Sequence, residues 1–489
     1  MTEPCDLSAI EARRLIGAKA LSPVELLESC LRRIDSTNAT LNAVIAVDGE
    51  RAMTAAREAE QTVADGRPLG LLHGLPLGVK DLNATRGLRT TFGSLLFRDH
   101  VPDQDDDVVA AMRTAGAVIL GKTNTPEFGA GANTWNLLFG ATGNPFDPDK
   151  TCAGSSGGGA VALAAGMMPL ANGSDYGGSL RTPAAFCGVS GFRPSPSVIP
   201  SPGRPAALLP FSVQGPMGRS LADAYLLLRA QARTDRRDPF TPGPALDLPA
   251  RLVEADLGAT KAAISTDLGC APVDAEIRAV FEERVGRFFG AFAAAETRDP
   301  DLGAVHEAFE VLRGVNFVAA HKDKLARHRD LLGPNVIDNT ERGLGYDLAD
   351  VAWAAAEQGR IYQRFTALFD DVDVLICPAA AVSPFPHSQL YPETVNGETM
   401  PTYMRWLALT YALTMALPAV CCLPCGVDRQ GLPFGIQVVG PNGSDAKVLR
   451  VAAALERVLA ADPVTARPQT DLARLAPDPH NRPHDEERP

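Results

Sequence analysis

The chain has 489 residues, 45% of them hydrophobic and 21% charged, which predicts a globular protein with one large core or two ordinary ones. Its formal net charge of −12 argues against a nucleic-acid surface, because neutralising phosphates requires clustered Lys and Arg side chains. We therefore expect a small-molecule substrate and no nucleic-acid partner.

The opening MTEPCDLSAIEARRLIG has no apolar stretch behind basic residues, so we expect neither a signal peptide nor a membrane anchor, and favour a cytoplasmic protein. The most apolar window, residues 411–427, is interrupted by Pro418 and Pro424 and falls short of the roughly 20 residues that span a bilayer. Nine scattered cysteines indicate reduced, mostly buried thiols. Cys422 and Cys425 form one CxxC, but no second pair or histidine cluster completes a metal site.

Helices are predicted over residues 7–64, because SPVELLESCLRRI combines Ser22 as a cap, Pro23 in the first turn and apolar residues at helical spacing. From Leu75 onward, short apolar runs alternate with helical patterns, as in LPLGVKD and DDVVAAMRTAGAVILGKTN. This alternation is typical of an α/β sheet, which the N-terminal helices are expected to flank.

Residues 232–250 are rich in Pro, Asp and Arg and predict a surface excursion, whereas residues 272–372 are expected to be mainly helical. Strand-like runs return at DVDVLICPA and GLPFGIQVVG, so the early and late strands are expected to share one sheet. The polar C-terminal segment, 469–489, predicts a disordered tail.

The segment GAVILGKT formally matches the Walker A pattern, with Lys122 and Thr123 in the expected places. A P-loop runs from strand to glycine loop to helix. Here a helix is expected to end near Gly116, AVIL is a buried strand, and Pro126 follows soon after. We therefore predict a strand-end turn rather than a nucleotide site.

The loop TCAGSSGGGA also contains a formal GxSxG around Ser156, which would suit the nucleophile elbow of an α/β-hydrolase. That mechanism needs an acid and then a histidine further along the chain. Of the eight histidines only His387, in SPFPHSQ, is a plausible partner, so the elbow is a weak alternative.

A second glycine-serine loop, GSDYGGSLRTPAAFCG at residues 173–188, carries a stronger signal. Two glycines allow the backbone N–H groups from Tyr176 through Gly177 and Gly178 to Ser179 to turn toward one point, just before a helix. Such N–H groups form an oxyanion hole, in which one donor is worth roughly 3 kcal/mol. A hydroxyl nucleophile there still needs a base.

Lys80, in GLPLGVKD, is a candidate for that base. It lies at the end of an apolar strand, with nothing charged in the six residues before it. Most lysines are simply exposed. A desolvated lysine, however, loses its proton more readily and can act as a base.

Five segments together resemble the amidase signature family of serine amidohydrolases: GLPLGVKD, GKTNTPEFG, GNPFDPDKTCAGSSGGGAVALAAG, GSDYGGSLRTPAAFCGVSGFRPS and GLPFGIQVVG. By this resemblance Lys80, Ser155 and Ser179 match the family's Ser-cisSer-Lys triad, with a cis peptide bond between Gly154 and Ser155. The resemblance implies an α/β fold with a large mixed central sheet covered by helices on both faces.

The resemblance also implies a single amidase domain over residues 1–468. Within it the N-terminal helices of 7–64 precede a signature core at 70–220. A variable, mainly helical region at 232–372 leads to the return to the core sheet at 373–440.

The triad implies a serine amidase that needs no metal or organic cofactor. Neutral Lys80 takes a proton through the Ser155 hydroxyl, Ser179 attacks the amide carbonyl, and the relay protonates the departing nitrogen. We favour a free-standing enzyme, as a monomer or homodimer. The alternatives are a subunit of the tRNA-dependent glutamine amidotransferase, which uses the same triad, and a catalytically idle binding relative. NTPEF, where those subunits usually read Asn-Met-Asp-Glu-Phe, disfavours the amidotransferase.

Substrate recognition is less constrained by the sequence. Gly129 matches a substrate-lining position of the family, and Tyr176 is expected to face the acyl group. Arg181 either binds a substrate carboxylate or forms a structural ion pair, and we favour the ion pair. The segments 376–390 and 403–419 are mostly apolar and are expected either to line the pocket or to pack in the core. If they line it, they favour neutral aryl or alkyl amides and aryl carbamates.

Overall fold

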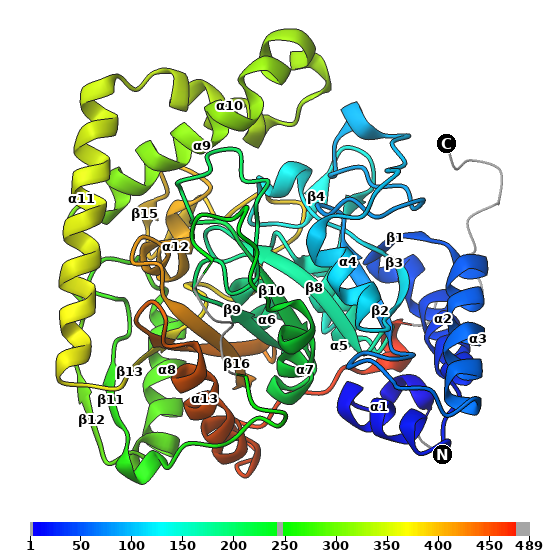
Figure 1. The fold of residues 1–489 in the computed structure, drawn as a ribbon. Helices are drawn as coiled ribbons and strands as arrows, with labels where there is room; N and C mark the ends of the chain where they lie inside the picture. The colour runs from blue at the N-terminus through cyan, green and yellow to red at the C-terminus, as the bar shows by residue number, and fades with distance from the viewer. Residues whose placement is uncertain (1–2, 242–247, 476–489) are drawn as a thin grey trace.

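In the computed structural model, which describes residues 3–241 and 248–475, an eleven-stranded mixed sheet runs through the centre of the molecule (Figure 1). The strand order is β1-β3-β2-β8-β10-β9-β16-β17-β13-β11-β12. The strands are β1 (Val44–Val47), β2 (Pro76–Lys80), β3 (Val118–Thr123), β8 (Leu170–Asp175), β9 (Ser190–Arg193), β10 (Val213–Gly218), β11 (Lys261–Ile264), β12 (Ala294–Thr297), β13 (Val374–Pro378), β16 (Ala419–Val427) and β17 (Pro433–Gly440). The early and late strands therefore share one sheet, as predicted.

Within the described residues, three short two-stranded sheets lie outside it, pairing β4 with β5, β6 with β7 and β14 with β15. Their strands are β4 (Trp135–Asn136), β5 (Gly140–Ala141), β6 (Gly143–Asn144), β7 (Asp147–Thr151), β14 (Thr394–Val395) and β15 (Glu398–Thr399). The α-helices are α1 (Ala9–Gly17), α2 (Pro23–Leu41), α3 (Gly49–Ala64), α4 (Asp107–Thr114), α5 (Gly157–Ala164), α6 (Arg181–Cys187), α7 (Leu221–Gln231), α8 (Ala275–Phe288), α9 (Val305–His328), α10 (Pro334–Leu344), α11 (Leu348–Ala367), α12 (Ala408–Thr414) and α13 (Asp445–Ala460).

Helices cover both faces of the sheet. In β10, Met217 packs toward Gly159 of α5, while the next residue, Gly218, lies against Ala224 of α7. Successive strand residues point to opposite faces, so α5 and α7 lie on opposite sides. This double cover explains why all residues of β2 and β3 are buried.

The predicted N-terminal helices form, and Ser22 caps α2 by accepting hydrogen bonds from the N–H groups of Val24 and Glu25. The prediction missed β1, which interrupts the helical region and pairs antiparallel with β3 at the sheet edge. At the other edge, β12 interrupts the mainly helical region of 272–372. Figure 1 shows α1 to α3 on one side of the molecule and β11, β12 and α11 on the other.

The prediction of a disordered tail over 469–489 is wrong for its first seven residues. Residues 469–475 are docked, because Thr470 donates a hydrogen bond to the Ala164 carbonyl and Leu475 is buried against α2. Residues 476–489 lie outside the described residues, as do 242–247 of the predicted surface excursion. Within the described ranges no helix combines the length and apolar character needed to cross a bilayer.

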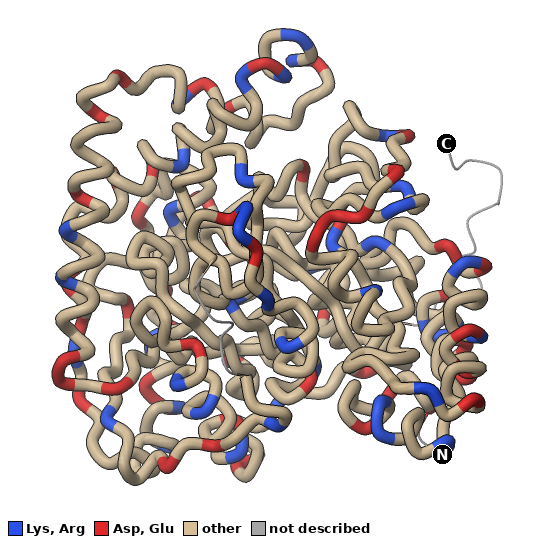
Figure 2. Tube along the Cα trace, viewed as in Figure 1, with Lys and Arg blue, Asp and Glu red and all other residues tan. Residues whose placement is uncertain are grey.

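Charged residues of both signs are interspersed along the outer helices, such as α3 and α11, whereas the central strands carry few (Figure 2). The exceptions are fully buried: Lys80 ends β2, Lys122 lies in β3, Asp175 ends β8 and Arg193 ends β9. Because burying an unpaired charge is costly, each of these four needs a specific environment.

Candidate active site

The carboxyl ends of two parallel strands bring the predicted site residues to one edge of the sheet. β2 pairs parallel with β8, so Lys80 at the end of β2 lies near Asp175 at the end of β8. Ser155 comes just before α5, and Ser179 just before α6. The Ser156 N–H donates to the Ser179 carbonyl at 3.1 Å, which ties the two serine loops together.

The approach of α5 to this edge explains its glycine-rich start. At Gly158 a Cβ atom would lie 2.3 Å from the backbone nitrogen of Asn124. Any side chain there would push the start of the helix away from β3. The glycines of GSSGGG thus allow close packing, and the peptide bond between Gly154 and Ser155 is cis, as the resemblance implied.

Lys80 is fully buried among hydroxyl groups. Its Nζ lies 2.8 Å from Ser155 Oγ, 2.9 Å from Ser156 Oγ and 3.0 Å from Ser174 Oγ. Burial lowers the pKa of Lys80 to about 7, although the negative charge of Asp175 opposes that shift. A substantial neutral fraction is therefore available near pH 7 to accept a proton from a hydroxyl.

Ser179 differs from Ser155 in its exposure. Ser155 is buried and accepts the hydrogen bond from Lys80. Ser179 is half-buried, and its hydroxyl makes no hydrogen bond within the described chain. Both residues line the same cavity. The structure thus brings all three predicted triad residues together, with one free hydroxyl facing the cavity.

The predicted oxyanion hole needs a correction at Gly178. Its φ of +123° turns its N–H toward Asp175, to which it donates at 2.9 Å, so this donor is already engaged. The N–H groups of Tyr176, Gly177 and Ser179 make no hydrogen bond in the part of the chain that the structure describes. Three of the four predicted donors remain free.

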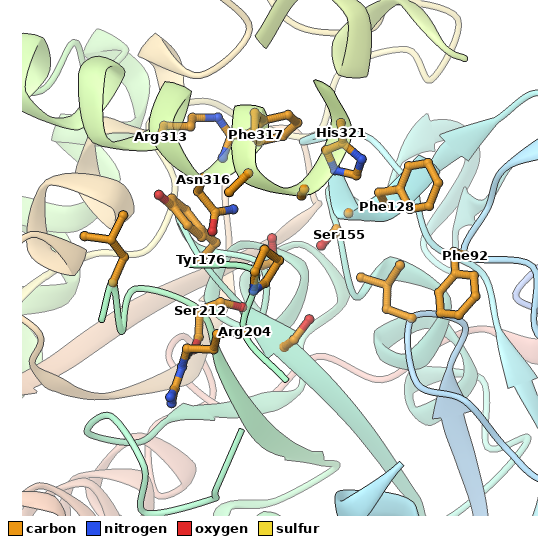
Figure 3. Close-up of a pocket in the computed structure, with 18 of the residues that line it drawn as sticks. Phe92, Phe128, Ser155, Tyr176, Arg204, Ser212, Arg313, Asn316, Phe317 and His321 are labelled. Atoms are coloured by element: carbon orange, nitrogen blue, oxygen red, sulfur yellow. Dashed lines mark hydrogen bonds between the residues drawn. The ribbon is translucent and has the colours of Figure 1, made fainter. Parts of the chain in front are cut away.

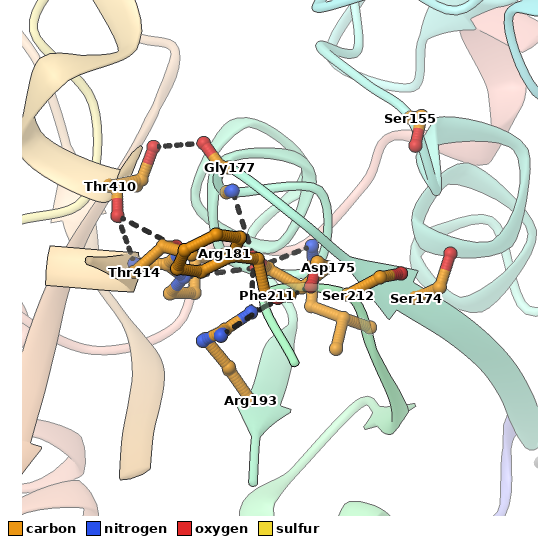
Figure 4. Close-up of polar contacts among 12 residues, drawn as sticks. Ser155, Ser174, Asp175, Gly177, Arg181, Arg193, Phe211, Ser212, Thr410 and Thr414 are labelled. Carbon is orange, nitrogen blue, oxygen red and sulfur yellow. Dashed lines mark hydrogen bonds and ion pairs between the residues drawn. The ribbon is translucent and has the colours of Figure 1, made fainter. Parts of the chain in front are cut away.

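Arg181 forms the structural ion pair that the sequence favoured. It is fully buried, and two of its nitrogens donate to the Asp175 carboxylate, each at 2.9 Å (Figure 4). Arg193 approaches the same carboxylate at 3.1 Å. Burial alone would raise the pKa of Asp175, but the two guanidinium groups hold it well below its usual range. This network fixes the loop that carries Ser179.

A cavity of about 580 Å³ opens above the serines (Figure 3). It is lined by Leu82, Phe92, Phe97, Phe128, Gly129, Ser155, Ser174, Tyr176, Ser179, Arg204, Pro205, Leu209, Ser212, Gln214, Arg313, Asn316, Phe317, Ala319, Ala320, His321 and Lys324. The predicted substrate-lining residues, Gly129 and Tyr176, are among them. At Gly129 a Cβ would lie 3.3 Å from Ser155 Oγ, so the glycine keeps the space above that serine open.

Of the two alternatives for segments 376–390 and 403–419, lining of the cavity is wrong, since neither segment contributes a lining residue. Residues 403–419 pack behind the serine loop: Thr410 Oγ1 donates to the Gly177 carbonyl at 2.7 Å, and Trp406 is fully buried. In the other segment, residues 376–381 are buried. Their apolar character therefore reflects core packing. These segments no longer support a preference for neutral substrates, because the actual walls come from the loops at 82–97 and 204–214 and from α9.

Sequence reasoning missed the contribution of α9, which supplies Arg313, Phe317, His321 and Lys324 to the cavity. Their spacing places them on one helical face, which was a usable signal. Other faces of α9, which pack on α10 and α11, show the same helical spacing in the sequence. Spacing alone therefore could not identify the face that lines the cavity.

The weaker motif matches carry no site chemistry. Lys122 and Thr123 lie within strand β3, and Lys122 is fully buried, with its Nζ donating to Thr85 Oγ1 at 2.9 Å. His387 does not line the cavity. Cys422 and Cys425 are buried in β16. Among the described residues, no three or more His, Cys, Asp or Glu side chains are grouped as they would be to hold a metal ion.

The family model described as Amidase matches residues 25–449. The chain is 34% identical over 454 residues to an acylamidase of Rhodococcus erythropolis, covering 92% of this chain and 95% of that one. It is 33% identical over 491 residues to a glutamyl-tRNA(Gln) amidotransferase subunit from Thermus thermophilus, covering 92% and 97%. A bacterial aryl acylamidase belonging to the Amidase signature enzymes superposes with a TM-score of 0.87 at 27% identity, covering 98% of this chain and 99% of that one.

Proposed function

The chain belongs to the amidase signature family of amide-cleaving hydrolases, and from this premise we propose that Ser179 is its nucleophile and that Ser155 and Lys80 form its proton relay. The observation that carries the proposal is the environment of Lys80. A buried lysine with a pKa near 7 lies 2.8 Å from the Ser155 hydroxyl, beneath a cavity that also exposes Ser179.

In the proposed reaction, neutral Lys80 accepts a proton through the Ser155 hydroxyl as Ser179 Oγ attacks the amide carbonyl. We assign stabilisation of the resulting oxyanion to the N–H groups of Tyr176, Gly177 and Ser179, which make no hydrogen bond within the described residues. As the carbon–nitrogen bond breaks, the relay returns the proton to the departing nitrogen. Water then hydrolyses the acyl-enzyme by the same route and regenerates Ser179.

The proposed substrates are linear aryl or alkyl amides. Phe92, Phe97, Phe128 and Phe317 give the cavity an aromatic wall, and its volume of about 580 Å³ suits a small molecule. Similarity to an acylamidase and to an aryl acylamidase supports this class. We extend it to aryl carbamates, since attack on a urethane carbonyl expels the same kind of amine.

The amidotransferase alternative is kept because several glutamyl-tRNA(Gln) amidotransferase subunits are 33% identical to this chain. The superposition on an aryl acylamidase favours the free-standing enzyme. Release of ammonia from glutamine by the purified chain, without cleavage of anilides, would support the amidotransferase instead.

The test is a set of serine and lysine variants assayed on an anilide. Ser179→Ala and Lys80→Ala are each expected to reduce kcat by roughly 10³-fold or more, and Ser155→Ala by nearly as much, because the relay acts as a unit. Ser212→Ala is the matched control, a serine that lines the same cavity outside the relay.

A fluorophosphonate is expected to label Ser179, as located by mass spectrometry. Labelling of Ser155 alone, or ordinary activity of Lys80→Ala, would contradict the proposed roles. In either case the family assignment would stand, but the mechanism would need another nucleophile or base.

A further inference from the structure

Three cationic side chains line the cavity, Arg204, Arg313 and Lys324, and none of its described lining residues is Asp or Glu. Arg204 is neutralised by Asp238 at 2.8 Å. Arg313 and Lys324 have no carboxylate within 4.0 Å among the described residues. The cavity therefore contains two positively charged side chains that no described carboxylate neutralises.

Arg313 is the more informative of the two, because its side chain is deeply placed and only 7% of the residue's surface is exposed. Its Nε donates to Asn339 Oδ1 at 2.8 Å and its Nη2 donates to the Tyr403 hydroxyl, both neutral acceptors. The rings of Phe317 and Tyr176 lie 4.6 and 5.4 Å from the guanidinium carbon. Its Nη1 makes no hydrogen bond in the described chain, and Figure 3 shows the guanidinium directed toward Tyr176 and Asn316.

A buried guanidinium cannot relieve its cost by losing a proton, since Arg stays charged in proteins. Neutral hydrogen-bond acceptors and aromatic rings solvate it in part. A carboxylate would supply the anionic partner that the guanidinium lacks, because its two oxygens match the donor geometry of Arg.

Lys324 extends the positive wall along the same face of α9. Its Nζ donates to the Ala320 carbonyl at 2.6 Å and lies 5.6 Å from the centre of the Phe128 ring. Between the two cations, His321 has a buried Nδ1 without a partner in the described chain. Burial, and then the charges of Lys324 and Arg313, lower the pKa of His321 to about 4, so its ring is neutral at pH 7.

We propose that this cavity selects amides that carry a carboxylate, with Nη1 of Arg313 as the principal contact and Lys324 as a supporting charge. The inference rests on the proposed function and specifies its substrate class. The aromatic wall holds the hydrocarbon part of the substrate, and the carboxylate takes no part in bond breaking.

The test compares pairs of amides that differ in charge but little in shape. The 4-nitroanilide of succinic acid carries a carboxylate on the acyl side, and its neutral counterpart is the 4-nitroanilide of 4-methylpentanoic acid, in which an isopropyl group replaces it. On the amine side, 4-acetamidobenzoate is paired with 4-isopropylacetanilide. The readout is the ratio of kcat/KM for the anionic and the neutral amide. Within one preparation this ratio is independent of the fraction of active enzyme.

In wild type we expect the anionic amide of at least one pair to be favoured about tenfold or more, consistent with a charge-assisted hydrogen bond. The pair that shows the preference identifies the side of the scissile bond that faces Arg313. Arg313→Gln is expected to bring that ratio close to one. Arg313→Lys should keep part of this preference, because the positive charge remains while the paired N–H donors of the guanidinium are lost.

Arg327→Gln is the matched control, since it removes one positive charge from an exposed position on the same helix. Equal or better hydrolysis of the neutral amides in both pairs would overturn the inference. A preference that persists in Arg313→Gln, or that Arg327→Gln removes equally, would also overturn it.

Binding to Ser179→Ala, measured by isothermal titration, separates this inference from the proposed function. Tighter binding of an anionic amide than of its neutral partner would support carboxylate recognition, even if wild type cleaves neither compound. The absence of cleavage would then contradict the proposed function alone. Equal dissociation constants for both pairs would overturn carboxylate recognition even if Ser179 is the nucleophile.

Discussion

Two fully buried lysines in neighbouring parallel strands show how partners decide the chemistry of a side chain. Burial is the main cause that lowers the pKa of both, to about 7 for Lys80 and about 8 for Lys122. Lys122 lies 3.8 Å from the buried Asp81 carboxylate and donates to Thr85, so it remains the cationic half of a structural pair. Lys80 is surrounded by hydroxyls instead, so in the proposed mechanism it is Lys80 that can accept a proton from a hydroxyl nucleophile.

The pH dependence of catalysis follows from this environment. In the proposed relay Lys80 acts as a base only when neutral, and burial lowers its pKa to about 7. For a neutral anilide, kcat/KM is therefore expected to be low at pH 5.5, to rise through about pH 7 and to level off above pH 8.

Stopped assays across this range measure the profile. Lys80→Arg is expected to be inactive throughout, because a guanidinium keeps its proton. A kcat/KM that is flat between pH 5.5 and 8.5 would argue against a lysine base of this pKa.

At the scale of elements, the two walls of the cavity are joined by one buried carboxylate. Glu127, next to the cavity residues Phe128 and Gly129, accepts hydrogen bonds from Ser94 Oγ and from the Gly333 N–H, each at 2.6 Å. Gly333 immediately precedes α10, which follows α9 in the chain. Glu127 therefore connects the segments that carry Phe92, Phe97 and Phe128 to the start of α10, which follows the helix that carries Arg313 and Lys324.

Glu127→Ala is expected to destabilise the fold by about 1–3 kcal/mol, because two buried donors lose their acceptor. It should raise KM more than it lowers kcat, since the cavity walls shift while the relay stays in place. Glu127→Gln keeps an acceptor oxygen, so its stability and its KM are expected to lie between those of wild type and Glu127→Ala. Urea unfolding and steady-state kinetics measure both effects.

The matched control is Glu341→Ala, which removes an exposed ion-pair partner of Arg329 from α10. Its effect is expected to be below about 1 kcal/mol. If Glu127→Ala changed KM no more than this control does, the carboxylate would not position the cavity walls.

The sequence predicted the elements whose signals are local. The cap at Ser22, the buried strand at β3 and the glycine-serine loops all depend on neighbouring residues. It missed β1 and β12, because four-residue edge strands are too short to show a period and form only by pairing with distant strands. The triad was recognisable from its motifs, but the cavity walls were not, since the packing of α9 over the serines depends on contacts far apart in sequence.

At the scale of the whole molecule, the Asp175 carboxylate links the two halves of the central sheet. It ends β8 and pairs with Arg193 of β9 and with Arg181 of α6. Arg181 in turn donates to the Thr410 carbonyl at 2.9 Å and to Gln437 Oε1 at 3.1 Å, in α12 and β17. The same carboxylate accepts the N–H groups that flank Ser179.

Asp175→Asn is therefore expected to reduce both stability and activity. Removing one partner from a buried ion-pair network leaves two guanidinium groups uncompensated, which costs about 3–5 kcal/mol. Asp301→Asn, which weakens an exposed pair with Arg364, is the control and should cost less than about 1 kcal/mol. Because the pKa of Asp175 in the folded protein lies well below its usual range, its stabilising effect is present above the ordinary aspartate pKa and is lost only in stronger acid. The difference in urea midpoint between wild type and Asp175→Asn should thus stay constant from about pH 8 to pH 5, and a difference that disappeared within this range would show that the carboxylate is not held ionised by its two arginines.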